Sequence, residues 1–144
     1  GIPVYGMGLG ALARAAAKMA APKNMPDARG RAIKRILGAM MAHPYMVAGR
    51  GRFDTIAMQA LGGRVASKSG AEGVHIAMLI DKGLGIALKV EDGTKRAADT
   101  AMAAMFEHLG VLDDKSRKAL KDFIRPAIVN AAGDPAGEVR MAAF

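Results

Sequence analysis

The stretch RVASKSGAEGV, residues 64–74, combines residue types that can transfer a proton. Lys68 lies between two serines and shortly before Gly70. A lysine amine is normally protonated, because its pKa is about 10.4, but burial or a neighbouring cation lowers that pKa. The neutral amine then accepts a proton from a serine hydroxyl. We therefore identify Lys68 as the candidate catalytic residue, at the end of an edge strand that faces a cleft.

Three neighbours of Lys68 are the candidate substrate-binding residues, Ser69, Gly70 and Glu72. Side chains alternate along a strand, so Ser67 and Ser69 are expected on the face opposite Lys68. Ser69 still offers its backbone N–H or its hydroxyl at the strand end, and Gly70 lets a substrate lie against the backbone. The alternative is a solvent-facing lysine before a hairpin turn, with Glu72 as an exposed turn carboxylate paired with a nearby cation.

Other polar residues are expected to serve the structure. Arg50, Arg52 and Asp54 lie ahead of or within the first turn of a predicted helix, where a cap or an N-terminal anion site explains them as well as catalysis does. The three histidines are His43, His75 and His108. They lie far apart without HxxxH or HxH spacing, and the chain has no cysteine. We therefore expect no metal site and no disulfide, and we interpret the histidines as structural.

Composition narrows the classes of protein. The 144 residues, 51% of them hydrophobic, suffice for one domain with a buried core. A net charge of +8 raises nucleic acid as a partner, but the densest positive charge occupies one helix face with few aromatic residues in reach, so nucleic-acid binding is not expected. No apolar run approaches the roughly 18–20 residues that cross a membrane. We expect a cytoplasmic protein without a membrane partner; the alternative to an enzyme is a non-catalytic binding or assembly module with a basic surface.

Hydrophobic periodicity predicts the elements that position these residues. Helices are expected over residues 11–20, from Asp27 as N-cap to residue 43, over 53–61, over about 94–109 and over about 114–123. Three short runs between residues 64 and 92, separated by turn-like SGAEG and DKGLG, predict an antiparallel meander. A hairpin around Gly-Asp-Pro follows. The expected fold class is α+β, an antiparallel sheet flanked by helices, with residues 1–144 as a single domain.

Four blocks of this sequence resemble the C-terminal part of the bacterial asparaginase II family, the Rhizobium-type L-asparaginases: HPYMVAGRGRFDT, SKSGAEGV, GIALKVEDGTKRA and NAAGDPAGEVR. The resemblance implies a serine-hydrolase fold like that of class A β-lactamases and penicillin-binding proteins, in which a Lys-Ser/Thr-Gly strand faces a serine from a Ser-x-x-Lys helix. Lys68, Ser69 and Gly70 match the strand motif. The implied activity is L-asparaginase, in which Ser–Lys pairs perform acyl transfer, release ammonia from L-asparagine and leave aspartate.

The sequence departs from the family in two respects. No serine or threonine has a lysine three residues later, so the nucleophilic serine and its local lysine are absent. The family's zinc site, built from two cysteines and a lysine, is absent too, so no cofactor is expected within this chain although zinc is possible in the full-length family. The resemblance therefore implies the C-terminal portion of a longer chain, inactive alone, whose partners are L-asparagine and the N-terminal half of the enzyme. Because a half-enzyme exposes the apolar surface that its other half would cover, we also expect a homo-oligomer, a dimer or an intertwined assembly. A serine hydrolase of another small amide, such as glutamine, is the alternative.

Overall fold

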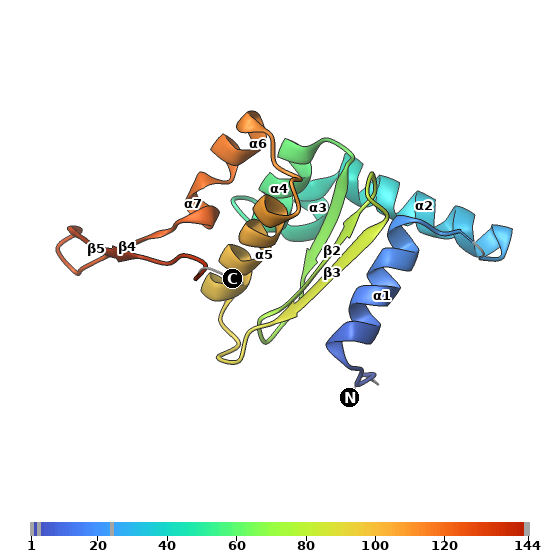
Figure 1. The fold of residues 1–144 in the computed structure, drawn as a ribbon, viewed down its shortest axis with the longest axis horizontal. Helices are drawn as coiled ribbons and strands as arrows, with labels where there is room; N and C mark the ends of the chain where they lie inside the picture. The colour runs from blue at the N-terminus through green and yellow to red at the C-terminus, as the bar shows by residue number, and fades with distance from the viewer. Residues whose placement is uncertain (1, 3, 24, 143–144) are drawn as a thin grey trace.

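The meander predicted between residues 64 and 92 forms the centre of the structure, a computed structural model that describes residues 2, 4–23 and 25–142. Its strands are β1 (Val65–Ser69), β2 (Val74–Leu79) and β3 (Leu84–Lys89). They pair antiparallel in the order β1-β2-β3, so β1 is an edge strand (Figure 1). The register places Ser67 opposite Ala77, Lys68 opposite Ile76 and Ser69 opposite His75.

Helices flank this sheet, which confirms the α+β class. The helices are α1 (Leu9–Ala20), α2 (Asp27–Ala42), α3 (Pro44–Ala48), α4 (Phe53–Leu61), α5 (Lys95–His108), α6 (Asp114–Ala119) and α7 (Lys121–Ile124). Asp27 is the first helical residue of α2 and not its N-cap, because Pro26 takes that position and no side chain caps the helix. The predicted helix over 114–123 is divided at Leu120 into α6 and α7.

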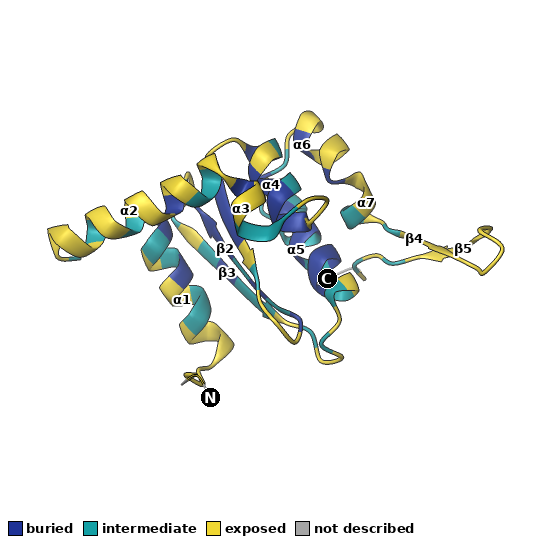
Figure 2. Ribbon diagram, turned by 180° about the vertical axis from the view of Figure 1, so that it is seen from behind, coloured by how far each residue is buried: buried dark blue, intermediate teal, exposed yellow. Residues whose placement is uncertain are grey.

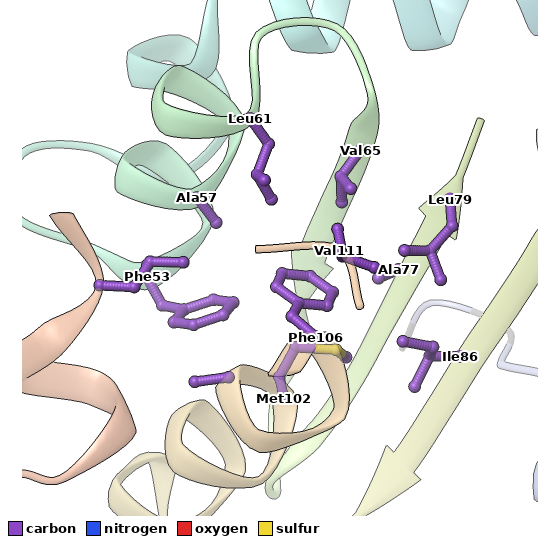
Figure 3. Packing of buried hydrophobic residues seen from close by; sticks show 12 residues of the cluster. Phe53, Ala57, Leu61, Val65, Ala77, Leu79, Ile86, Met102, Phe106 and Val111 are labelled. Atoms are coloured by element: carbon purple, nitrogen blue, oxygen red, sulfur yellow. The ribbon is translucent and has the colours of Figure 1, made fainter. Parts of the chain in front are cut away.

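One face of the sheet packs against α4 and α5 around large apolar side chains. Figure 3 shows side chains from α4, all three strands and α5 pointing into the same core, and Phe53, Met102 and Phe106 are each 0% exposed. The Phe53 ring lies 5.9 Å from the Phe106 ring and 5.3 Å from the Phe123 ring, centroid to centroid. Such rings contribute most of the buried apolar area, so this face fixes where α4 stands relative to β1.

The other face of the sheet packs against α1 and α2 around smaller side chains. Ala16 and Ala20 of α1 and Leu37 of α2 meet Ala66 of β1 in a second buried cluster. Helix α1 crosses β3 so closely that a Cβ at Gly85 would lie 2.2 Å from the backbone nitrogen of a residue in α1. A glycine in a strand marks such a close approach. Helix α2 extends past the sheet and is mostly exposed (Figure 2).

The predicted terminal hairpin also forms, as β4 (Ala127–Val129) paired antiparallel with β5 (Pro135–Glu138). It projects away from the rest of the molecule, and both strands are exposed along their length (Figures 1 and 2). Within the described residues, none of the helices combines the length and the apolar character that a membrane crossing requires.

Candidate functional site

The end of β1 is held from one side by a buried carboxylate on α4. Alternation along the strand directs Ser67 and Ser69 towards α4, where Asp54 is 0% exposed. The Ser67 hydroxyl donates to Asp54 Oδ1 at 2.6 Å, and the Ser69 hydroxyl donates to Asp54 Oδ2 at 2.7 Å. The backbone N–H of Ser69 also donates to Oδ2, at 2.9 Å. One carboxylate therefore accepts three hydrogen bonds from a single strand end.

His75, from the neighbouring strand β2, completes this buried group. Its Nε2 lies 2.8 Å from Asp54 Oδ1 and 3.0 Å from the hydroxyl oxygen of Ser67. The side chain is 0% exposed and meets the Phe53 ring edge to face at 5.3 Å. The pairing of Ser69 with His75 in the strand register accounts for this proximity. Asp54, Ser67, Ser69 and His75 are called the Asp54 network below.

Asp54 is ionised in this network. Burial of the Asp54 carboxylate favours its neutral form, but the hydrogen bond and charge of His75 and the hydroxyls of Ser67 and Ser69 outweigh burial. Together they hold the Asp54 pKa well below its usual value of 3.8. Its position in the first turn of α4 adds the favourable field of the helix N-terminus. The carboxylate is thus a fixed negative charge inside the molecule.

A second pair of charges connects the Asp54 network to the surface. His75 Nδ1 lies 3.9 Å from Asp99 Oδ1 of α5, and Asp99 Oδ2 accepts a hydrogen bond from Lys95 at 2.8 Å. Neither His75 Nδ1 nor Asp99 Oδ1 has a hydrogen-bond partner among the described residues. Carboxylate, imidazole, carboxylate and ammonium therefore alternate from the interior to the exterior, an order in which each group has a partner of opposite sign when His75 is protonated.

A small cavity of about 70 Å³ opens beside the Asp54 network, between the β1–β2 turn and the start of α5. It brings together Ser69, Gly70 and Glu72, the three residues predicted to bind substrate. The full lining is Arg52, Ser69, Gly70, Glu72, Gly73, Val74, Gly93, Lys95, Ala98 and Asp99. The binding roles of these residues stay a prediction, but the structure does place all three in the lining of one cavity.

Lys68 lies on the opposite side of β1. Ala66, which shares that face by alternation, is buried against α1 and α2, whereas Lys68 is exposed and its amine donates to the carbonyl of Ser69. The prediction that Ser67 and Ser69 point away from Lys68 is therefore confirmed. The sequence argument also required a cleft that desolvates the amine, and none of the described residues buries Lys68. Its catalytic role stays a prediction.

Sequence reasoning missed what two acidic residues do. Asp54 is a first-turn acid of α4, as expected, but it also binds the end of β1, and Asp99 received no role at all. Asp99 had a local signal: it follows Ala98 and precedes Met102 on the buried side of α5, where a carboxylate needs a partner. Its partner His75 comes from β2, and its partner Lys95 lies four residues upstream in α5. His75 is buried, in keeping with a structural histidine.

The residues present do not fit the zinc site that the family resemblance implies. That site takes two cysteines, and this chain has none. Within residues 2, 4–23 and 25–142, no group of three or more His, Cys, Asp or Glu side chains is arranged to hold a metal ion. No step of the proposed function is therefore assigned to a metal.

Comparison with known proteins gives the family of this chain. The model of the family described as L-asparaginase II matches residues 1–141. A search of curated proteins finds no match. The matched range includes β1, the Asp54 network, the cavity and Lys68.

Proposed function

This chain belongs to the L-asparaginase II family, and from that premise we propose that it supplies part of an active site that hydrolyses the side-chain amide of L-asparagine. An L-asparaginase-like amidohydrolase function holds at the level of the family. The observation that carries the finer proposal is the end of β1. There, a Lys-Ser-Gly sequence is fixed by a buried carboxylate and borders a cavity that three predicted substrate-binding residues line.

In the proposed reaction Lys68 moves the proton. A serine hydroxyl from outside these 144 residues attacks the amide carbon of L-asparagine, and its proton passes to the neutral Lys68 amine. The protonated lysine then gives that proton to the departing nitrogen, which leaves as ammonia, and an acyl-enzyme ester remains. Water hydrolyses the ester, so that aspartate is released and the serine is restored. General acid–base transfer of this kind contributes about 10²–10⁴-fold to a rate.

The exposure of Lys68 sets a condition on this mechanism. An amine in water is protonated at neutral pH and cannot accept the serine proton. We therefore propose that the N-terminal half of the enzyme, the expected source of the serine, also covers Lys68 and lowers its pKa by desolvation. The Asp54 network supports this arrangement, because it fixes the backbone of β1 without using any atom of the Lys68 side chain.

The proposal is tested by ammonia release from L-asparagine and from L-glutamine. The full-length protein is expected to release ammonia from L-asparagine, and Lys68→Ala to lower kcat by about 10²–10⁴-fold. Lys89→Ala is the matched control, because Lys89 is also exposed at a strand end and donates to the carbonyl of the next residue. Residues 1–144 alone are expected to be inactive. Hydrolysis of L-glutamine alone would reassign the substrate, and an unchanged kcat in Lys68→Ala would remove Lys68 from the mechanism.

Association between copies is proposed as well. Apolar side chains near the start of the chain are largely exposed, with Val4 and Tyr5 at 89%, and Met46 of α3 is 81% exposed. Apolar surface of this kind favours association when it is contiguous. Light scattering on the full-length protein as it elutes from a size-exclusion column is expected to give the mass of an oligomer. A monomer mass at micromolar concentration would contradict this proposal.

A further inference from the structure

The cavity beside Ser69 has a lining whose formal charges cancel. Arg52 and Lys95 contribute two positive groups, and Glu72 and Asp99 contribute two negative groups. A site for a phosphate or a simple carboxylate would carry an excess of positive charge. A balanced lining instead suits a ligand that bears one charge of each sign.

Two of these four charges are available to a ligand. Lys95 and Asp99 already pair at 2.8 Å, and Asp99 is only 7% exposed, so this ion pair forms a fixed wall. Arg52 and Glu72 are both exposed and form no ion pair or side-chain hydrogen bond within the part of the chain that the structure describes. An arginine fork binds a carboxylate through two parallel hydrogen bonds, and a carboxylate accepts from an ammonium group.

The backbone holds Glu72 in an unusual conformation at this position. Its φ is +56°, a left-handed value that non-glycine residues rarely adopt and that costs free energy. The next residue, Gly73, has a φ of +67°, and a Cβ there would be crowded, at 3.0 Å from the Cβ of Val90 and 3.2 Å from Gly93. The carbonyl of Gly73 also accepts the N–H of Val90 at 3.1 Å. The turn that carries Glu72 is thus locked against the loop before α5.

The size of the cavity agrees with a small head group. A water molecule needs roughly 10–15 Å³ of such space, so about 70 Å³ accommodates roughly five to seven non-hydrogen atoms. The ammonium, Cα and carboxylate of an α-amino acid contain five. A side chain attached to that Cα extends out of the cavity, where groups from other parts of the enzyme can reach its amide.

We propose that this cavity binds the zwitterionic head group of an α-amino acid, with Glu72 pairing with the α-ammonium and Arg52 with the α-carboxylate. The inference rests on the proposed amidohydrolase function and extends it to the charges that select an amino acid over a simple amide. It assigns Arg52 a binding role and gives Glu72 a defined partner in the substrate. The Lys95–Asp99 ion pair forms another part of the same lining.

Two substrate analogues separate the two contacts. Succinamate lacks the α-ammonium of L-asparagine, and 3-aminopropanamide lacks the α-carboxylate. In the full-length enzyme, Glu72→Gln is expected to lower kcat/KM for L-asparagine about tenfold and to change succinamate, measured as a substrate or an inhibitor, less than twofold. Arg52→Gln is also expected to lower kcat/KM for L-asparagine about tenfold, and to leave the value for 3-aminopropanamide unchanged. A lost charged hydrogen bond at a partly exposed site has an effect of about this size.

A second glutamate and a second arginine provide matched controls. Glu91→Gln and Arg50→Gln remove exposed charges that do not line the cavity, and both are expected to keep wild-type kcat/KM. Equal losses on L-asparagine and on the matching analogue would overturn the assignment, because a removed contact cannot weaken a ligand that never made it. Wild-type kinetics in Glu72→Gln and Arg52→Gln would overturn it as well.

Calorimetry distinguishes failure of this inference from failure of the proposed reaction. If the full-length protein hydrolyses no amide, L-asparagine itself can be titrated as an unreactive ligand. Binding that Glu72→Gln weakens about tenfold would support the amino-acid site and reject the hydrolase. No binding of L-asparagine to the wild-type protein would overturn the site.

Discussion

The two faces of the central sheet pack against different kinds of side chain. Towards α4 and α5 the sheet packs against aromatic rings beside the Asp54 network, in which Asp54, Ser67 and His75 are fully buried and Ser69 is half-buried. Towards α1 and α2 it presents Ala66, Met78 and Gly85, and on the same face of β1 it leaves the Lys68 amine exposed. Every hydrogen bond from β1 to Asp54 comes from Ser67 or Ser69, and none comes from Lys68.

This difference indicates that the two faces of β1, a strand of five residues, serve different purposes. The buried face fixes the position of the strand end, because an ionised carboxylate accepts a backbone N–H and two hydroxyls there. The exposed face carries the Lys68 side chain, which none of the described residues buries. Because side chains alternate along a strand, the support from Ser67 and Ser69 and the proposed role of Lys68 do not compete for the same space.

The largest effect is expected from Asp54→Asn. The change removes the nearer of the two carboxylates that face His75, at 2.8 Å against 3.9 Å for Asp99. It also turns an amide group that donates two N–H bonds towards groups that themselves donate. Removing one member of a buried charged pair costs about 3–5 kcal/mol of unfolding free energy, measured by chemical denaturation. Asp81→Asn, at an exposed turn between β2 and β3, is the control and is expected to change that free energy by less than about 0.5 kcal/mol. Equal stability of the two variants would show that the Asp54 network does not fix β1.

A somewhat smaller loss is expected on the opposite face, from Gly85→Val. Any side chain at residue 85 collides with the backbone of α1, which lies 2.2–2.7 Å from the position of a Cβ. Overpacking of this kind costs about 3 kcal/mol and should separate α1 from β3, which increased proteolysis within residues 9–20 would report. Gly38→Val, where nothing lies within 4 Å of a Cβ, is expected to leave stability unchanged. A fully stable Gly85→Val protein would contradict the close packing of α1.

Acid is expected to weaken the buried face without any mutation. The folded-state pKa of Asp54 lies below its unfolded value, so the unfolded chain binds more protons in acid. The unfolding free energy should therefore be constant above about pH 5 as far as Asp54 is concerned, and fall as the pH decreases further. Asp92 and Asp113 also have lowered pKa values, mainly through backbone hydrogen bonds from Thr94 and Ser116, but both are exposed. The double variant Asp92→Asn/Asp113→Asn should keep most of the acid dependence, and a flat profile between pH 6 and pH 3 in that variant would remove Asp54 as its source.

Most of the fold could be predicted from local signals. The turns SGAEG and DKGLG separated three short apolar runs and so predicted the meander. Glycines with left-handed backbone conformation, Gly62 and Gly110, follow α4 and α5. The short helix α3 was missed, because no helix was expected between the predicted helix that ends at residue 43 and the one that begins at residue 53. Proline also starts helices, since its fixed φ suits the first turn.

The candidate site could be predicted only where its residues lie close together in the sequence. Ser69, Gly70 and Glu72 belong to one turn, and they do line one cavity. The contacts of Asp54 with His75, 21 residues away, and with Ser67, 13 residues away, depend on how α4 packs against β1 and on the register of β1 with β2. A single sequence does not contain that packing. The environment of Lys68 likewise depends on which surface covers it.

The two faces of β1 are compared most directly by measuring ammonia release and unfolding free energy together for two adjacent variants of the full-length protein. Lys68→Ala is expected to lower kcat by about 10²–10⁴-fold while changing the unfolding free energy by less than about 0.5 kcal/mol. Ser67→Ala is expected to lose about 1 kcal/mol of stability and less than tenfold in kcat. Retention of wild-type kcat by Lys68→Ala would contradict the division between the supporting face and the reacting face.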